Sequence, residues 1–311
     1  MPKALVTGGA GFIGSHVAEL LLSLGWEVIV LDDLSTGKRE NLPCACRFYE
    51  MDIRDSALHG ILGKERPDFV SHQAAQMSVV RSVADPAFDA SVNILGLINL
   101  LQACVSHAVK KVVFACTGGA LYGEPDPANL LCAESHPIAP LSPYGITKAA
   151  CEHYFRYFNT THHLPYVSLR YGNVYGPRQD PHGEAGVVAI FCGAMLRDQP
   201  VRLYGHGEAT RDYVHVRDVA RANHLAMVSD LAAGSLNIST GAETSVQQVF
   251  DILAESLGYT MTPELLPLRP GEVNRIALDG SAAEKALGWT PQVDLKDGLL
   301  ETARFFAARA G

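Results

Sequence analysis

The chain has 311 residues, of which 48% are hydrophobic and 19% charged, with a net charge of −8 at pH 7. This is an ordinary globular composition, and the length suits a doubly wound domain with a smaller second one. The acidic balance, without any basic run, argues against nucleic acid and membrane surfaces as partners, and no apolar stretch nears the roughly 20 residues of a membrane span.

The start of the chain and its cysteines predict a cytoplasmic protein. The first predicted strand begins at Ala4, which leaves no room for a signal peptide before it. The seven cysteines are odd in number, and no two of them form a C-x-x-C pair. Reduced thiols are the simplest interpretation, and we expect no metal site.

The N-terminal segment reads as strand, glycine turn, helix, strand and acid, in that order. Gly8, Gly11 and Gly14 form the turn, and Asp32 and Asp33 end the second strand. The glycines let the backbone approach a pyrophosphate at the positive end of the helix, and the acid about 20 residues on accepts hydrogen bonds from a ribose diol. The predicted boundaries are Ala4–Val6, Phe12–Leu24 and Val28–Leu31.

The pattern therefore predicts dinucleotide binding. Asp32 would repel a 2′-phosphate, which favours NAD over NADP. Lys38 and Arg39 lie close enough in sequence to leave NADP open.

Further strands and helices alternate along the chain. Apolar strands between helices predict a parallel sheet covered on both faces, in which ligands bind beyond the carboxyl ends of the strands. The expected fold is therefore an α/β doubly wound parallel sheet (Rossmann). The next strands are expected at Cys46–Met51, Asp68–His72, Lys111–Ala115 and Tyr166–Arg170, and helices near Phe88–Ser106 and Pro143–Thr160. Polar or hydroxyl residues at strand ends are Asp32, Asp52, Gln73, Thr117 and Tyr171.

The regularity loosens after Tyr175, where a glycine- and proline-rich segment precedes helices expected near Val187–Arg197, Val246–Leu257 and Leu295–Ala308. We expect a smaller α/β C-terminal domain that binds the substrate. The predicted division places residues 1–174 and about 212–242 in the dinucleotide-binding domain, and about 175–211 and 243–311 in the second.

Tyr144 and Lys148 lie four residues apart in a helical pattern, so their side chains reach the same space. A lysine ammonium stabilises the phenolate and lowers its pKa, and lowering it by about three units takes roughly 4 kcal/mol. That is reasonable if a second positive charge, such as an oxidised nicotinamide, lies nearby. The pair predicts proton transfer coupled to hydride transfer.

Nine motifs occur in order between residues 7 and 273, and together they carry a resemblance. They are TGGAGFIG, LDDLSTG, HQAAQ, SVN, FACTGGALYG, PYGITK, RYGNVYGPRQ, RDYVHVRDVA and RPGEV. The chain resembles the extended short-chain dehydrogenases/reductases that act on nucleotide sugars, most of all the UDP-glucose (UDP-galactose) 4-epimerases. The resemblance implies tightly held NAD, a UDP-hexose substrate and a homodimer formed through the Phe88–Ser106 and Pro143–Thr160 helices.

The resemblance also implies roles for single residues. Tyr144 would take the proton from the sugar's 4-hydroxyl, Lys148 would hold the nicotinamide ribose and lower the tyrosine pKa, and Thr117 would bridge the 4-oxygen and Tyr144. The cofactor would be held by Gly8, Gly11, Phe12, Ile13, Gly14, Asp32, Asp33, Ser35, Thr36, Gly37, Asp52, Ile53, Gln73, Ala74, Ala75, Asn93, Tyr144, Lys148 and Tyr171. The substrate would be held by Thr117, Tyr144, Asn173, Arg211, Arg269 and Glu272.

Several alternatives stay open at this point. Arg211 could instead pair with Asp212 or Asp218, and Arg269 could be a solvated surface charge. Ile276, seven residues after Arg269, is expected near the substituent at sugar carbon 2, so N-acetylated hexoses and uronic acids remain possible substrates. A non-catalytic NAD-binding sensor is the alternative of a different class, because a fold alone does not fix a function.

Dehydratase and decarboxylase chemistry is disfavoured. Related enzymes with those activities place an acid one or two residues after the active-site threonine or serine. Here Thr117 is followed by Gly118, Gly119 and Ala120, none of which can move a proton at a second carbon.

Overall fold

The computed structural model describes residues 1–126, 131–181, 186–268 and 273–310. Its centre is a seven-stranded sheet in the order β12-β7-β5-β4-β1-β2-β3, and every pair of neighbouring strands is parallel. The strands are β1 (Lys3–Thr7), β2 (Glu27–Asp32), β3 (Arg47–Glu50), β4 (Phe69–His72), β5 (Lys111–Thr117), β7 (Tyr166–Tyr171) and β12 (Ala233–Ile238). The predicted doubly wound parallel sheet is confirmed.

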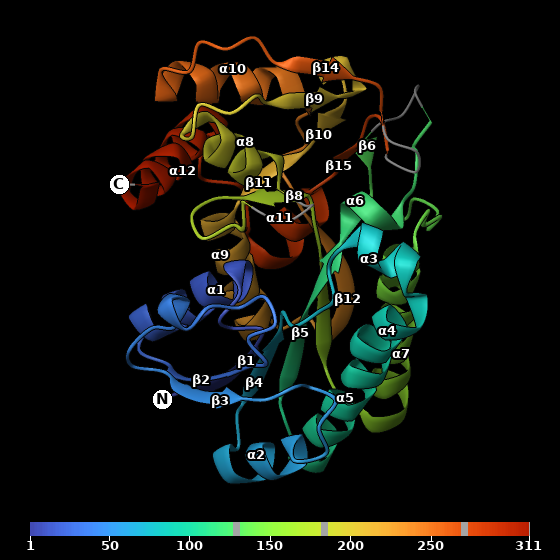
Figure 1. The fold of residues 1–311 in the computed structure, drawn as a ribbon. Coiled ribbons are helices and arrows are strands. Elements are labelled where there is room, and N and C mark those ends of the chain that lie inside the picture. The colour runs from blue at the N-terminus through green and yellow to red at the C-terminus, as the bar shows by residue number, and fades with distance from the viewer. Residues whose placement is uncertain (127–130, 182–185, 269–272, 311) are drawn as a thin grey trace.

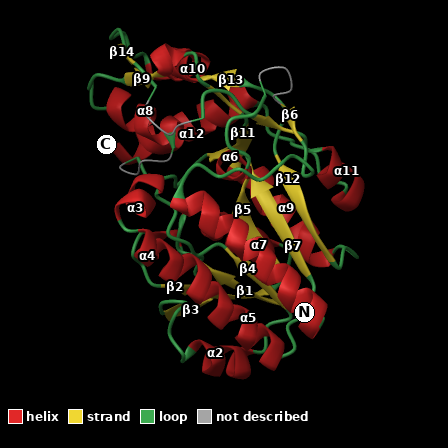
Figure 2. Cartoon of the chain, turned by 90° about the vertical axis from the view of Figure 1, so that its right-hand side faces the viewer, coloured by secondary structure: helices red, strands yellow, loops and turns green. Residues whose placement is uncertain are grey.

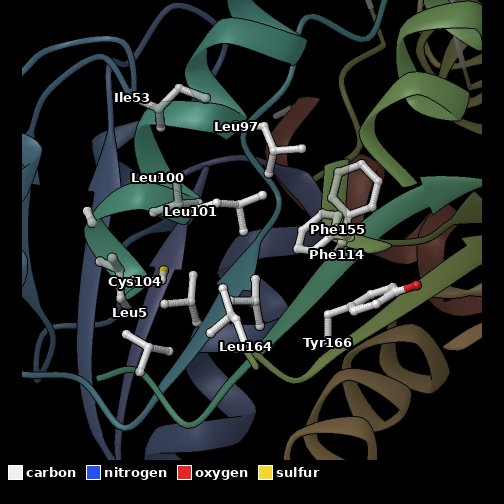
Figure 3. Packing of buried hydrophobic residues seen from close by; sticks show 14 of the residues in the cluster. Leu5, Ile53, Leu97, Leu100, Leu101, Cys104, Phe114, Phe155, Leu164 and Tyr166 are labelled. Carbon is white, nitrogen blue, oxygen red and sulfur yellow. The ribbon is translucent and has the colours of Figure 1, made fainter. Parts of the chain in front are cut away.

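Helices cover both faces of this sheet (Figures 1 and 2). Because successive strand residues point to opposite faces, Leu5 packs in one apolar cluster while Ala4 and Val6 pack in another. The first cluster holds α2 (Leu58–Glu65), α5 (Gly96–Ser106) and α7 (Pro143–His162) against the sheet, and the second holds α1 (Phe12–Ser23) and α9 (Val216–Val228). Figure 3 shows Leu97, Leu100, Phe114 and Phe155 of the first cluster.

The helix predicted at Phe88–Ser106 is continuous from Pro86 and contains an irregular turn. It consists of α4 (Pro86–Ala90), a π-helical turn η2 (Ser91–Leu95) and α5. At 21 residues and mean hydropathy 1.5 it is long and apolar enough to cross a membrane by length and composition alone, so the expectation that no stretch reaches that length is wrong. In this fold 44% of its apolar window is buried, as in a core helix that packs on α7.

The C-terminal elements form a separate apolar core above the carboxyl edge of the sheet (Figure 1). Tyr175, Phe191, Leu203 and Phe250 belong to it. Its helices are α8 (Val187–Met195), α10 (Val246–Leu257) and α12 (Leu295–Ala310). Four two-stranded pairs accompany them: β8 (Asn173–Tyr175) with β11 (Tyr213–His215), β9 (Arg202–Tyr204) with β14 (Glu264–Leu266), β10 (Thr210–Arg211) with β13 (Thr244–Ser245), and β6 (Leu131–Cys132) with β15 (Ala277–Leu278). The remaining elements are α3 (Val79–Ala84), α6 (Gly118–Leu121), α11 (Ser281–Leu287), η1 (Arg39–Asn41) and η3 (Gly205–Gly207). The division of the chain into two domains near residues 174, 212 and 242 stays a prediction.

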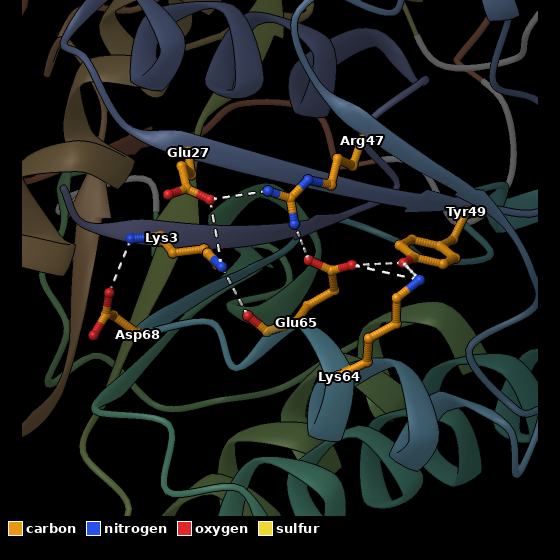
Figure 4. Close-up of polar contacts among 7 residues, drawn as sticks. All are labelled: Lys3, Glu27, Arg47, Tyr49, Lys64, Glu65 and Asp68. Atoms are coloured by element: carbon orange, nitrogen blue, oxygen red, sulfur yellow. Dashed lines mark hydrogen bonds and ion pairs between the residues drawn. The ribbon is translucent and has the colours of Figure 1, made fainter.

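A polar network closes the opposite, amino-terminal edge of the sheet (Figure 4). The buried Glu65 carboxylate of α2 accepts hydrogen bonds from Arg47 at 2.5 Å and from Tyr49 at 2.6 Å, and Arg47 also reaches Glu27. The hydrogen bond from Tyr49 lowers the pKa of Glu65. These ion pairs and hydrogen bonds hold α2 against β2 and β3. They lie at the edge opposite the carboxyl ends of the strands, where ligands bind in sheets of this kind.

Candidate active site

A cavity of about 1430 Å³ lies along the carboxyl edge of the sheet. The central strands of the sheet end in it, and elements of the C-terminal core cover it from β8 to β9. Most predicted site residues line it: Gly8, Gly11, Phe12, Ile13, Gly14, Asp32, Asp33, Ser35, Thr36, Asp52, Ile53, Gln73, Ala74, Ala75, Thr117, Tyr144, Lys148, Tyr171, Asn173 and Arg211. Residues from both halves of the chain therefore meet in one space.

The glycine turn fits a close approach of backbone to ligand. Gly8 has φ +68°, and a Cβ there would lie 2.6 Å from the Ala74 nitrogen. A Cβ on Gly14 would lie 2.1 Å from the Gly8 carbonyl oxygen. Helix α1 begins after Gly11, and no side chain caps it, so its first amide groups face the cavity. Such a helix start binds an anionic group.

Asp32 is buried at the end of β2. Its carboxylate accepts hydrogen bonds from the Ala10 amide at 3.0 Å and the Leu34 amide at 2.8 Å, and burial raises its pKa. Gly37 does not line the cavity; it packs against this carboxylate, where a Cβ would lie 2.6 Å from Oδ1. An acid held in place at this edge is suited to a ribose diol.

The two cations that left NADP open differ in position. Lys38 lines the cavity. Arg39 does not line it: its guanidinium pairs with Glu50 and stands 5.1 Å from the centroid of the Phe48 ring. Because Arg39 is paired with Glu50 and does not line the cavity, this geometry favours NAD over NADP.

Thr117, Tyr144 and Lys148 all line the cavity. Thr117 ends β5, and its hydroxyl accepts a hydrogen bond from the Ala120 amide at 3.2 Å. Ser142 caps α7 and so fixes the first turn that carries Tyr144. Lys148 is buried, and its ammonium donates to the Ala115 carbonyl at 2.8 Å and stands 5.8 Å from the centroid of the Tyr144 ring.

The electrostatics of this group differ from the expectation. Burial raises the pKa of Tyr144, and the neighbouring Cys116, Asp89 and Cys151 raise it further. Burial also lowers the pKa of Lys148. Burial is the largest of these effects on Tyr144, and it outweighs the expected lowering by the lysine. A further positive charge in the cavity would favour the phenolate of Tyr144 and lower its pKa.

Arg211 hydrogen-bonds to backbone carbonyl groups. It donates to the carbonyls of Thr210 at 2.8 Å and Asn274 at 3.1 Å, and it belongs to no ion pair among the described residues. Asp212 is occupied by the Thr240 and Gly241 amides, and Asp218 pairs with Arg221. The alternative of pairing with Asp212 or Asp218 is therefore wrong, and the guanidinium lines the cavity. Arg269 and Glu272 lie outside the described residues.

Besides Gly37, two other predicted positions within the described residues do not line the cavity. Asn93 is buried, and its amide bonds both the amide and the carbonyl of Gln76, at 2.9 and 3.0 Å. It therefore supports the loop that follows β4 without facing a ligand. Ile276 is buried against Tyr122, Cys132 and Leu278 and does not line the cavity, and its place near the sugar substituent stays a prediction.

Sequence reasoning missed part of the lining. Met77, Ser78 and Val79 after β4, and Tyr204 at the end of β9, line the cavity. No spacing in the sequence marks this first group, and only the structure shows that the apolar side chains of Met77 and Val79 are exposed. Among the described residues no cluster of histidine, cysteine and acidic side chains could hold a metal ion.

Comparison with known proteins places the chain in a family. Residues 4–239 match the model of the NAD dependent epimerase/dehydratase family, and the chain belongs to it. A UDP-glucose 4-epimerase of Mycolicibacterium smegmatis is 43% identical, and the match covers 98% of each chain.

Solved structures agree. A UDP-glucose 4-epimerase of Thermotoga maritima with UDP-glucose has a TM-score of 0.96 at 47% identity and covers 99% of this chain and 100% of its own. A UDP-glucose 4-epimerase of Thermus thermophilus in complex with NAD has a TM-score of 0.92 at 48% identity and covers 98% of both chains.

Proposed function

We propose that this protein is an NAD-dependent isomerase that inverts carbon 4 of a UDP-hexose, interconverting UDP-galactose and UDP-glucose. The observation that carries the proposal is the meeting of Thr117, Tyr144 and Lys148 in one cavity with the uncapped start of α1. The similar enzymes that carry UDP-glucose or NAD support the same activity.

The residues present fit the cofactor. The glycine turn leaves room that a Cβ would fill, Asp32 suits the adenosine ribose, and Lys148 suits the nicotinamide ribose. When bound, NAD supplies a hydride acceptor for carbon 4 and, in its oxidised form, the positive charge that Tyr144 lacks.

The chain's own groups then handle the proton and the sugar. Tyr144 takes the proton from the 4-hydroxyl, and the Thr117 hydroxyl bridges the 4-oxygen and the phenol. Arg211 holds the pyrophosphate by charge-assisted hydrogen bonds, and Asn173 holds the sugar beside Gly119. The 4-keto sugar turns over and is reduced on its other face. Arg269 and Glu272 remain proposed ligands of the nucleotide on the strength of the resemblance.

Epimerisation is preferred to dehydration because the two residues after Thr117 carry no side chain. Gly118 packs on Leu278 so closely that a Cβ would lie 2.2 Å from a methyl carbon, and Gly119 faces Asn173. Neither position offers an acid to the sugar, so proton transfer at carbon 5 has no donor or acceptor there.

We also propose a cytoplasmic homodimer. No disulfide joins the cysteines of the described residues, as is usual in a reducing compartment. On the α5 and α7 side, Leu95, Ile146 and Tyr157 are more than half exposed, with 60%, 55% and 53% of their surface accessible. Helices Phe88–Ser106 and Pro143–Thr160 would pair across the dimer, and light scattering of the purified protein tests this.

A proton NMR time course of UDP-galactose in deuterated water, without added NAD, tests the activity. We expect UDP-glucose with no deuterium on ring carbons. Deuterium at carbon 5 or a 4-keto-6-deoxy product would mean dehydratase chemistry. If UDP-galactose is unchanged but an N-acetylated or uronic UDP-sugar is converted, that sugar is the substrate. If none of these sugars is converted, the result would favour a non-catalytic NAD-binding sensor.

A further inference from the structure

Asp89 is a buried carboxylate behind the catalytic pair, and the proposed mechanism does not use it. It lies in α4, its exposed fraction is 0%, and it does not line the cavity. Oδ1 accepts hydrogen bonds from Gln76 Nε2 at 2.7 Å and Asn93 Nδ2 at 3.1 Å. Oδ2 accepts one from the Thr147 hydroxyl at 2.8 Å.

These partners indicate the state of the carboxyl group. All three groups donate, and an ionised carboxylate is a group that only accepts. No ion pair among the described residues includes Asp89. Because a buried charge without a counter-ion is costly, a carboxylate kept here by amide and hydroxyl donors calls for a reason beyond stability.

The hydrogen bonds hold two parts of the site together. Gln76 and Asn93 belong to the loop after β4 and to η2, and the Gln76 side chain also bonds the backbone of Ser78, which lines the cavity. Thr147 stands between Tyr144 and Lys148 on α7 and lies 2.9 Å from the Tyr144 carbonyl oxygen. Asp89 therefore connects the cavity loop to the turn of α7 that carries both catalytic side chains.

Asp89 also contributes charge to this pair. The titratable groups around Tyr144 and Lys148 are His72 on β4, Cys116 on β5, Cys151 on α7 and Asp89 on α4. Burial lowers the pKa of His72 to about 3 and raises the pKa of Cys151 to about 12, and it raises that of Cys116 as well. Burial favours the neutral form of these three groups, and the three donors around the Asp89 carboxyl oxygens suit its ionised form, so Asp89 supplies the negative charge beside the pair.

We propose that Asp89 is a positioning residue for the proposed epimerisation, on which this inference rests: its carboxylate fixes the Gln76–Ser78 loop against α7 and keeps a negative charge behind Tyr144 and Lys148. The charge stabilises the ammonium and opposes the phenolate. It therefore raises the pKa of both Tyr144 and Lys148 relative to the same site without this carboxylate.

The Asp89→Asn variant separates charge from geometry. Its amide oxygen can accept from Gln76 and Asn93, and its amide nitrogen can donate to the Thr147 oxygen, whose proton then turns to the Tyr144 carbonyl. We expect the protein to stay folded and both limbs of the kcat–pH profile to move to lower pH by about one unit. Asp89→Ala also removes the hydrogen bonds, and we expect amide exchange at residues 76–78 to rise at least tenfold.

Asp218→Asn is the matched control, because Asp218 is an equally buried carboxylate at the start of α9, held by Arg221 and backbone amides and away from the cavity. It should weaken folding without moving either limb. Unmoved limbs in Asp89→Asn, equal movement in Asp218→Asn, or unchanged exchange in Asp89→Ala would each overturn the inference. If wild-type protein fails to turn over any UDP-hexose, the proposed function fails instead, and the exchange measurement still decides the positioning role.

Discussion

Replacing Gly14 by alanine tests whether the glycine turn is built for close approach. The new Cβ would lie 2.1 Å from the Gly8 carbonyl oxygen and 2.8 Å from two more backbone atoms. Because backbone cannot rotate away as a side chain does, the turn itself must shift. Overpacking costs about 1–3 kcal/mol, and the upper end applies to a clash with backbone. Alanine recovers about 0.5–1 kcal/mol as a better helix former, which leaves a net loss of about 2 kcal/mol.

Gly60→Ala is the matched control. Gly60 also lies inside a helix, α2, but a Cβ added there would meet no atom within 4 Å, so the same exchange should stabilise the protein by about 0.5–1 kcal/mol. Urea unfolding measures the free energy, and NAD content per purified chain measures the site. We expect Gly14→Ala to lose both stability and NAD, and Gly60→Ala to lose neither. A Gly14→Ala protein with wild-type stability and full NAD content would refute the reasoning about the turn.

Three further substitutions test the assignments. Tyr144→Phe removes the proton acceptor, so turnover should fall by about 10²–10⁴-fold while NAD content, measured after denaturation, stays unchanged; unchanged turnover would contradict the mechanism. Asp32→Asn removes the repulsion of a 2′-phosphate, so the preference for NAD over NADP in equilibrium binding should narrow at least tenfold. Ile276→Val deletes one buried methylene away from the cavity, so it should lower the free energy of unfolding by about 0.5–1.5 kcal/mol. The ratio of UDP-galactose to UDP-N-acetylgalactosamine turnover should stay unchanged. A changed ratio would indicate that Ile276 does contact the sugar pocket.

The sheet was predictable because its strands are short apolar runs separated by helical patterns. The predictions at 4–6, 28–31, 68–72, 111–115 and 166–170 correspond to β1, β2, β4, β5 and β7 within a residue or two. Strand β12 was not predicted, since AGSLNI has a mixed pattern and joins the edge of the sheet through pairing with β7, which lies far earlier in the chain. Long-range pairing of this kind leaves no local trace in the sequence.

Site residues divide in the same way. Residues whose chemistry belongs to a local pattern, such as the glycine turn and the Tyr144–Lys148 pair, were found, and all of those line the cavity. Asn93 is a residue whose position could not be predicted in this way. Its side-chain amide hydrogen-bonds to Gln76, a partner that neither helical nor strand spacing reveals. The π-helical turn that contains Asn93 was not predicted either, because such turns are rare and short.

The position of Lys148 bears on when Tyr144 becomes a base. The chain's own groups raise the tyrosine pKa by burial, and the ammonium is committed to the Ala115 carbonyl. In the proposed mechanism, the oxidised nicotinamide would supply a positive charge that favours the phenolate of Tyr144, and the reduced one would not. Proton removal would then be tied to the oxidised state of the cofactor, and proton return to the reduced state. A site with a permanently ionised tyrosine would lose this coupling, because the phenolate would hold no proton to give back when the 4-keto sugar is reduced.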